Sequence, residues 1–384
     1  MNRDAYITDL AGFLPNAPVD NEHVERVLGR LNGKPSRAMR ITLRNNGIRL
    51  RHYAIDPVTG KFTHNNTDMT AAAVRTVMQR ANVPLDSLDL LCCGTSSPDQ
   101  IAPAHGNMVH GELKSPPCEV VTFAGICATG ASALKYAYLN VTAGQSSTAV
   151  SSGSEFVSSC MRASQFKPET DSMVVELEAK PELAFEKDFL RWMLSDGAGA
   201  ALVRDKPNAD RLSLRIDWIE GRSFAGQLES CMYAGAIKLD DGSLRGWREP
   251  EDPQETLREG YFAVKQDVRL LNEHIVPIAV KETLIPIAKR RALAPDQVTW
   301  FLPHLSSEYF RPRLNSEMVA SGFNIPMERW FTNLTTTGNI GSAAVYVMLE
   351  EMLYSGRLRR GDRLLCLIPE SSRFSIYYIH LTAV

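Results

Sequence analysis

Apolar and polar positions along the chain predict strands and helices that alternate over most of its length. Short apolar runs that are typical of buried strands occur at residues 6–10, 88–94, 120–123, 147–151, 196–203, 298–304 and 363–368. Small and apolar residues at helical spacing occur at residues 68–78, 130–139, 264–287 and 342–349. Asp68 is placed as an N-cap residue for the first of these helices. The alternation predicts an α/β fold whose sheet contains parallel strands.

The two ends of the chain repeat one order of elements. Gly130 begins a helix of small residues that is followed by a strand and by Glu155, 25 residues later. Gly341 begins a similar helix, followed by a strand and by Glu370, 29 residues later. A repeat of this length predicts two duplicated α/β units related by a pseudo-twofold axis.

Composition narrows the class of protein. The chain has 384 residues, 44% hydrophobic and 22% charged, which suits a globular enzyme with two α/β halves. The net charge of −2 offers no general attraction to nucleic acid. No run of about 18 apolar residues predicts a membrane span, and the N-terminal residues do not resemble a signal peptide. Seven cysteines without metal-like spacing favour a reducing cytoplasmic location and no metal site. The polar stretch at residues 164–187 is predicted to be an insertion over the site.

Cys127 is the first candidate for chemistry. It lies between the predicted strand at residues 120–123 and the predicted helix at residues 130–139. Free N–H groups and the positive end of the dipole at a helix N-terminus stabilise a thiolate, so this position predicts a nucleophile. A buried and inert core cysteine would give the same local pattern.

Two later residues strengthen the hypothesis of a reactive cysteine. His304 ends a predicted strand, and Asn339 lies in a loop before another helix of small residues. Open α/β sheets place their chemistry at the carboxyl ends of strands, so all three side chains are expected at one edge. A core histidine and a loop-capping amide are the alternative interpretations of His304 and Asn339.

The cysteine, histidine and asparagine together resemble the thiolase-fold condensing enzymes of the β-ketoacyl synthase III family. Residues 46–52 and 195–200 are similar to the family's Gly-Ile-basic and Asp-Gly-Ala-Gly-Ala segments. The resemblance implies a five-layered αβαβα arrangement of two duplicated βαβαβαββ halves. Residues 1–205 would carry the cysteine, and residues 206–384 would carry the histidine and asparagine.

The resemblance also implies roles for these residues. Cys127 would accept an acyl group from a thioester, and His304 and Asn339 would donate hydrogen bonds to the carbonyl of the second substrate. No cofactor or metal is expected, since the substrates are carried on the phosphopantetheine of acyl carrier protein or coenzyme A. The expected partners are acyl carrier protein and a second copy of the chain, without nucleic acid or membrane.

Glu155 and the loop at residues 369–375 resemble one branch of the family. This branch contains the ring-forming ketosynthases of dialkylresorcinol and stilbene pathways. It implies that a β-ketoacyl thioester and an α,β-unsaturated acyl thioester are joined into a cyclohexane-1,3-dione. Glu155 would be a base whose pKa is raised by burial, or alternatively a salt-bridged or interface carboxylate.

Some positions depart from the family pattern. Ser307 replaces an asparagine three residues after the histidine, and a tryptophan and an arginine that clamp coenzyme A fall at Ile41 and Asn45. Ala102 replaces a bulky aromatic residue at the end of the pocket, which leaves room for a longer acyl chain, and Ile101 and Ala102 are expected to reach toward a partner subunit. The candidates for a basic carrier-docking patch are Arg311 and Arg313, followed by Arg162 and Lys167.

Three other functions stay open from the sequence. A decarboxylating synthase III would use a malonyl donor in fatty acid or polyketide synthesis. An acyltransferase on the same fold would pass the acyl group from Cys127 to an alcohol or amine. A silent subunit would only shape an active partner, although it would have no need for Cys127, His304 and Asn339 together.

Overall fold

The computed structural model describes residues 3–166, 171–180 and 190–384. Within these residues, nine strands form one mixed sheet in the order β13-β14-β15-β8-β1-β7-β6-β4-β5. The strands are β1 (Tyr6–Phe13), β4 (Leu90–Thr95), β5 (Glu119–Ala124), β6 (Thr148–Glu155), β7 (Gly197–Arg204), β8 (Leu214–Ser223), β13 (Trp300–Pro303), β14 (Arg363–Glu370) and β15 (Ser375–Ala383).

The sheet divides into two layers where β1 meets β8. These strands pair at Tyr6–Arg215 and Ile7–Leu214, close to their first residues, and then diverge. Strands from residues 6–204 form one layer and strands from residues 214–383 form the other, a grouping compatible with the boundary predicted at residue 205. Pairing is parallel between β4 and its neighbours and between β13 and β14, and antiparallel elsewhere in the sheet.

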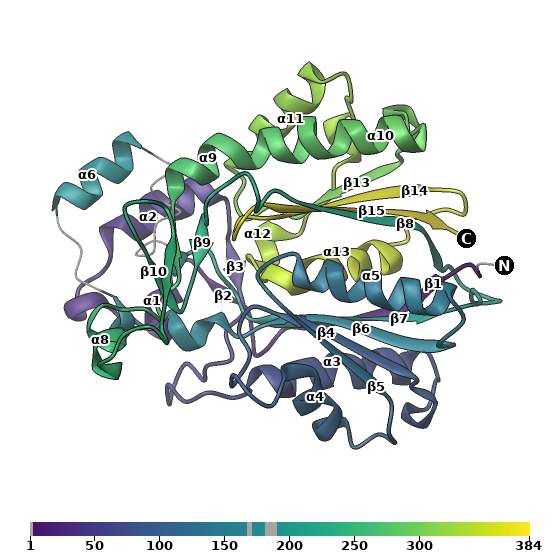
Figure 1. Ribbon diagram of the computed structural model, residues 1–384, viewed down its shortest axis with the longest axis horizontal. Helices are drawn as coiled ribbons and strands as arrows, with labels where there is room; N and C mark the ends of the chain where they lie inside the picture. The colour runs from purple at the N-terminus through teal and green to yellow at the C-terminus, as the bar shows by residue number, and fades with distance from the viewer. Residues whose placement is uncertain (1–2, 167–170, 181–189) are drawn as a thin grey trace.

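Helices cover both outer faces and fill the space between the two layers (Figure 1). Helices α3 (Asn66–Arg80) and α4 (His105–Leu113) lie on one outer face, and α9 (Val268–Pro277), α10 (Ile285–Arg291) and α11 (Phe310–Ala320) lie on the other. Helices α5 (Thr129–Thr142) and α13 (Ala344–Tyr354) lie between the layers. The expected five-layered αβαβα thiolase fold is therefore confirmed.

The two central helices, α5 and α13, begin with small residues because they approach each other closely there. A Cβ atom added at Gly130 or Gly153 would collide with the carbonyl oxygen of Ser342, just before α13. The Tyr346 hydroxyl donates to the carbonyl of Gly130 at 2.8 Å. This contact explains the small residues at the start of both helices and brings the turns before them, which carry Cys127 and Asn339, to one place.

The remaining elements cover one end of the layers, on the left in Figure 1. They are β2 (Val19–Asp20), α1 (Val24–Leu28), α2 (Arg37–Asn46), β3 (Leu50–Arg51), α6 (Asp171–Ala179), β9 (Met232–Tyr233), β10 (Ala236–Lys238), β11 (Leu244–Gly246), α8 (Pro253–Arg258), β12 (Lys265–Gln266) and α12 (Leu334–Thr337). The predicted insertion at residues 164–187 falls partly outside the described residues, and its described helix α6 packs against α2.

Two predictions of local structure are wrong. Helix α3 begins at Asn66, and its N-cap is Asn65 rather than Asp68, which closes a capping box with Asn65 from the third helical position. The single helix predicted at residues 264–287 is divided into α9, a π-helical stretch at Ile278–Leu284, and α10. Pro277 has no N–H to donate, so the helical hydrogen-bond pattern changes there.

Within the described residues, no helix is both long and apolar enough to cross a membrane. In the same part of the chain, no group of three or more histidine, cysteine, aspartate or glutamate side chains could hold a metal ion.

Candidate active site

Cys127 lies in the turn that connects β5 to α5. The helix begins at Thr129 with Ala128 as its N-cap, so the cysteine stands just before the first turn, as predicted. The backbone N–H groups on either side of it, at Ile126 and Ala128, donate to Oε2 of Glu370 at 3.1 and 3.0 Å. A carboxylate therefore binds the N-cap N–H of α5 and a second N–H of the turn that precedes it.

The electrostatics of this turn differ from the prediction. Burial raises the pKa of the Cys127 thiol, and the negative charges of Glu155 and Glu370 raise it further. The backbone N–H of Cys127 itself acts in the opposite direction, with a smaller effect. The expected stabilisation of a thiolate by the helix N-terminus is therefore opposed, first by burial and then by the charges of Glu155 and Glu370.

His304 follows directly after β13. Its backbone N–H donates to the carbonyl of Leu367 in β14 at 2.8 Å, which extends the parallel pairing by one residue. The side chain is 4% exposed, and Nε2 has no hydrogen-bond partner within the described residues. Burial lowers the pKa of this imidazole to about 4, so the ring is neutral at physiological pH. A neutral ring can place an N–H donor at Nε2 toward a ligand.

Asn339 lies between α12 and α13 and is fixed by its backbone. Its N–H donates to Met193 O at 3.1 Å, and its carbonyl accepts the N–H of Ser195 at 2.9 Å. Its side-chain Oδ1 accepts the N–H of Gly341 at 3.0 Å. No hydrogen bond from Nδ2 occurs within the described part of the chain, so this amide can donate to a ligand.

Glu155 is the last residue of β6 and is 1% exposed. Its Oε1 accepts the N–H of Ser342 at 3.0 Å, and its Oε2 accepts the hydroxyls of Ser97, at 2.9 Å, and Ser96. Burial raises the pKa of this carboxyl group, whereas the hydrogen bonds from these serines oppose the shift. The raised pKa agrees with the predicted base. Within the described residues Glu155 forms no salt bridge, which was one of the two alternative interpretations.

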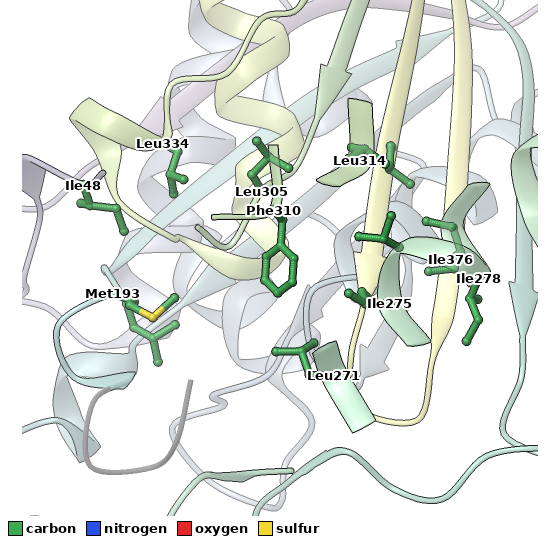
Figure 2. Packing of buried hydrophobic residues seen from close by; sticks show 14 of the residues in the cluster. Ile48, Met193, Leu271, Ile275, Ile278, Leu305, Phe310, Leu314, Leu334 and Ile376 are labelled. Atoms are coloured by element: carbon green, nitrogen blue, oxygen red, sulfur yellow. The ribbon is translucent and has the colours of Figure 1, made fainter. Parts of the chain in front are cut away.

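One cavity of about 350 Å³ contains all four of these residues. Apolar side chains form most of its wall, and these are Ile126, Val157, Leu190, Met193, Leu194, Met232, Val264, Leu271, Ile275, Val276, Ala279, Leu305, Phe310, Leu314 and Leu367. Figure 2 shows Met193, Phe310, Leu271 and Ile275 gathered around one space. An apolar chamber beside the half-buried Cys127 suits an extended acyl chain.

Comparison with known proteins shows what the chain is similar to. A family model described as 3-oxoacyl-[acyl-carrier-protein] synthase III C terminal matches residues 288–367. The β-ketoacyl-[acyl-carrier-protein] synthase III of Xanthomonas oryzae pv. oryzae is 24% identical over 321 residues, 83% of this chain and 82% of that protein. The synthase III of Methylococcus capsulatus is 23% identical over 372 residues, 95% of each. The chain is an acyl-condensing enzyme that is similar to the synthase III family.

Solved structures share the fold of this condensing enzyme. AbyA1, a tetronic acid condensing enzyme, has a TM-score of 0.76 and 21% identity, and the similarity covers 98% of this chain and 99% of AbyA1. OleA of Xanthomonas campestris, solved with bound lauric acid and lauroyl-CoA, has a TM-score of 0.74 and 19% identity over the full length of both chains.

The other residues singled out from the sequence lie outside the cavity of the condensing enzyme. Ala102 is exposed, beside Ile101 with 70% exposure, and does not line the chamber of its own chain. Ser307 is 1% exposed, and its hydroxyl accepts the N–H of Tyr309 at 3.2 Å. The expected direct contact of Ala102 and Ser307 with substrate is therefore not seen within one chain.

The expected docking arginines are already paired. Arg311 binds Glu308 with its Nη2 at 2.8 Å, and Arg313 binds the side chain and the carbonyl of Asn272. Arg162 donates to the carbonyl of Gly60 at 2.9 Å, and Lys167 lies outside the described residues. The charge of Arg311 is thus balanced by a carboxylate, whereas Arg313 keeps its charge but has its guanidinium bound to Asn272.

Sequence reasoning missed one wall of the cavity and one carboxylate. The segment at residues 232–266 supplies lining residues from β9 and β12, namely Met232, Tyr233, Ala234, Val264 and Gln266. The sequence indicates Glu370 as a member of the repeat and of the loop at residues 369–375, but not its contact with the Cys127 turn, which spans 244 residues. The repeat itself was the available signal, because it places Glu370 where Glu155 stands in the other half.

Proposed function

We propose that this condensing enzyme joins a β-ketoacyl thioester to an α,β-unsaturated acyl thioester and forms a 2,5-disubstituted cyclohexane-1,3-dione, the precursor of dialkylresorcinols and stilbenes. The observation that carries the proposal is the buried carboxyl group of Glu155 in the same cavity as Cys127, His304 and Asn339. A donor that loses no carboxylate before the first bond forms needs a base to remove a proton from carbon, and a carboxyl group with a raised pKa is suited to this.

The first step is thioester exchange at Cys127. The sulfur attacks the carbonyl of the unsaturated acyl thioester, a new carbon–sulfur bond forms, and the bond to the carrier sulfur breaks. The proton of the Cys127 thiol ends on the departing carrier thiol. A resting thiol rather than a thiolate is compatible with this exchange, because one proton passes from the sulfur of Cys127 to the sulfur of the carrier.

The second step makes the carbon–carbon bonds. The carbon between the two carbonyls of the β-ketoacyl group loses a proton to the base and adds to the β-carbon of the unsaturated chain. The enolate left by this addition then takes the proton back from the base. The carbon on the other side of the keto group loses a proton to the base and attacks the carbonyl of the Cys127 thioester. The carbon–sulfur bond breaks, the ring closes, and the proton passes from the base to the released sulfur of Cys127. Hydrolysis of the remaining carrier thioester and loss of CO₂ leave the cyclohexane-1,3-dione.

His304 and Asn339 stabilise the charge that develops in these steps. Nε2 of His304 and Nδ2 of Asn339 are side-chain donors of the cavity that have no protein partner among the described residues. Each would donate to a thioester carbonyl whose oxygen becomes negative as the adjacent carbon loses its proton. Because both are held by backbone contacts, little reorganisation is needed when the charge appears.

A decarboxylating synthase III that uses malonyl-carrier protein is the second candidate. The names of the relatives favour it, since the match to the Methylococcus capsulatus synthase covers 95% of this chain. Loss of CO₂ from a malonyl group produces the carbanion without a base. The buried Glu155 is then only a structural residue.

The test incubates the enzyme with β-ketoacyl-carrier and enoyl-carrier thioesters, and separately with malonyl-carrier and an acyl thioester. The proposal expects the mass of a cyclohexane-1,3-dione from the first mixture and no ketoacyl product from the second. A Glu155→Gln variant should still load Cys127 but lose the ring product. Turnover of malonyl donors alone, unaffected by Glu155→Gln, would instead establish the decarboxylating function.

Acyl carrier protein and a second copy of the chain are the partners that we propose. The relatives' name includes the acyl carrier protein, and exposed Ile101 beside Ala102 offers an apolar contact for a second copy. Analytical ultracentrifugation of wild type and Ile101→Asp tests the dimer, since a charge at a buried interface should produce monomers. A monomeric wild type would overturn this part of the proposal.

A further inference from the structure

We propose that Glu370 is a positioning residue for the nucleophile, whose carboxylate fixes the Cys127 turn by its flanking N–H groups and places a negative charge beside the sulfur. The inference rests on the proposed function only in taking Cys127 as the nucleophile. It assigns a task to the last residue of β14.

Glu370 accepts hydrogen bonds with both of its carboxylate oxygens. The residue ends β14, is 8% exposed, and binds the N–H groups of Ile126 and Ala128 with a single oxygen. Its other oxygen accepts the hydroxyl of Ser372. Both carboxylate oxygens are therefore bound, and the two N–H groups that flank the nucleophile cannot turn toward the sulfur.

Gly125 begins the turn that Glu370 binds. A Cβ atom added there would lie 3.0 Å from the methyl group of Thr129, a tight contact, and 3.5 Å from Oε2 of Glu370, an ordinary van der Waals contact. The φ angle of Gly125 is 159°, which a residue with a side chain rarely adopts. Glu370 therefore lies within van der Waals reach of the backbone of this turn, in addition to its two hydrogen bonds.

Three titratable side chains lie near the sulfur, and each stands at the end of a different strand. Glu155 approaches from β6 and Glu370 from β14, and the neutral His304 follows β13. Both carboxylates oppose the loss of the Cys127 proton, in addition to the effect of burial. The arrangement keeps the cysteine as a thiol until an acyl thioester enters, which limits its alkylation and oxidation in the empty enzyme.

The test measures the rate at which iodoacetamide alkylates Cys127 as a function of pH, with the modified cysteine assigned by peptide mass spectrometry. Glu370→Gln keeps an oxygen for the two N–H groups and an amide for Ser372 but removes the charge. We expect the alkylation profile of this variant to shift to lower pH by about one unit. Glu350→Gln is the matched control, because Glu350 also accepts a backbone N–H, from Gly12, but lies outside the cavity.

Glu370→Asp separates position from charge. The shorter side chain keeps the charge but cannot reach both N–H groups, so acyl loading of Cys127 should fall by about tenfold or more. Circular dichroism and thermal unfolding verify that the variants are folded. If Glu370→Gln titrates like wild type and Glu370→Asp loads normally, Glu370 has no positioning role. Alkylation requires no acyl substrate, so this result is independent of whether the ring-forming reaction occurs.

Discussion

Glu155 and Glu370 each end a strand of one half of the chain and bind the turn that leads into the central helix of the other half. Glu155 accepts the N–H of Ser342, at the start of the segment that leads into α13. Glu370 accepts N–H groups at the start of α5. Because Asn339 and Cys127 immediately precede these helices, the two carboxylates hold two of the reactive side chains in place across the pseudo-twofold axis.

Replacing Cys127 should abolish covalent loading. Cys127→Ala removes the sulfur that accepts the acyl group, so intact-protein mass spectrometry with enoyl-carrier and acyl-coenzyme A thioesters should show an adduct on wild type only. Cys118→Ala is the matched control, since Cys118 is a half-buried free thiol outside the cavity, and should load like wild type. An adduct that persists in Cys127→Ala would remove Cys127 as the nucleophile.

Replacing His304 or Asn339 should separate loading from condensation. In His304→Ala or Asn339→Ala, one donor to the developing oxyanion is lost, and condensation should fall by about 10²–10³. The Cys127 adduct should still form, because the thiol and its turn are unchanged. Single-turnover loading and product formation are measured side by side. Equal losses in both steps would contradict a role limited to the second substrate.

The stability of the protein should depend on His304 between pH 4 and 6.5. Burial depresses the pKa of this residue to about 4 in the folded state, while the unfolded chain binds a proton near 6.5. The stabilising effect of the neutral ring is complete above pH 6.5 and is lost as pH falls through 4. The free energy of unfolding should lose up to about 3 kcal/mol from this residue over that range.

The measurement is chemical denaturation of wild type and His304→Gln at several pH values. The difference between the two proteins should be largest near pH 7 and shrink as the pH is lowered. His110→Gln is the control, because His110 is half-buried and outside the cavity. A difference that does not change with pH would show that the folded protein does not hold His304 neutral.

Filling the apolar chamber should shorten the acyl chains that the enzyme accepts. Ala279 lines the cavity from the π-helical stretch after α9, and Ala279→Leu adds three carbons to a chamber of about 350 Å³. Loading of a dodecanoyl thioester should fall severalfold while an acetyl thioester loads normally. Ala288→Leu overpacks the same helical layer without touching the chamber, and should leave chain-length preference unchanged.

Charge reversal at Arg311 tests the docking hypothesis. Arg311→Glu places two like charges beside each other, because Glu308 already binds this arginine. If the helix contacts an acidic carrier protein, KM for carrier-bound thioesters should rise severalfold, while KM for short pantetheine thioesters stays constant. Equal effects on both substrates would indicate a structural role, and no effect would place the docking surface elsewhere.

The local pattern of the sequence predicted many of the strands and helices, and it indicated Cys127, His304 and Asn339 as candidates that lie in one cavity. Strand β5, helix α5 and the turn between them follow from apolar runs and small residues, and Cys127 stands in that turn as expected. His304 and Asn339 follow from the same reasoning, since strand ends meet at one edge of a sheet. These features depend on periodicity over a few residues, which a sequence displays directly.

Tertiary structure alone decided the charge state and the walls of the site. The pKa of Cys127 depends on burial and on Glu370, which lies 244 residues from the turn that it binds. The wall from residues 232–266 and the pairing of Arg313 with Asn272 likewise join segments with no shared local pattern. Burial and hydrogen-bond partners depend on which residues surround a group in the folded chain. Residue spacing could therefore indicate the candidate groups but not their pKa values.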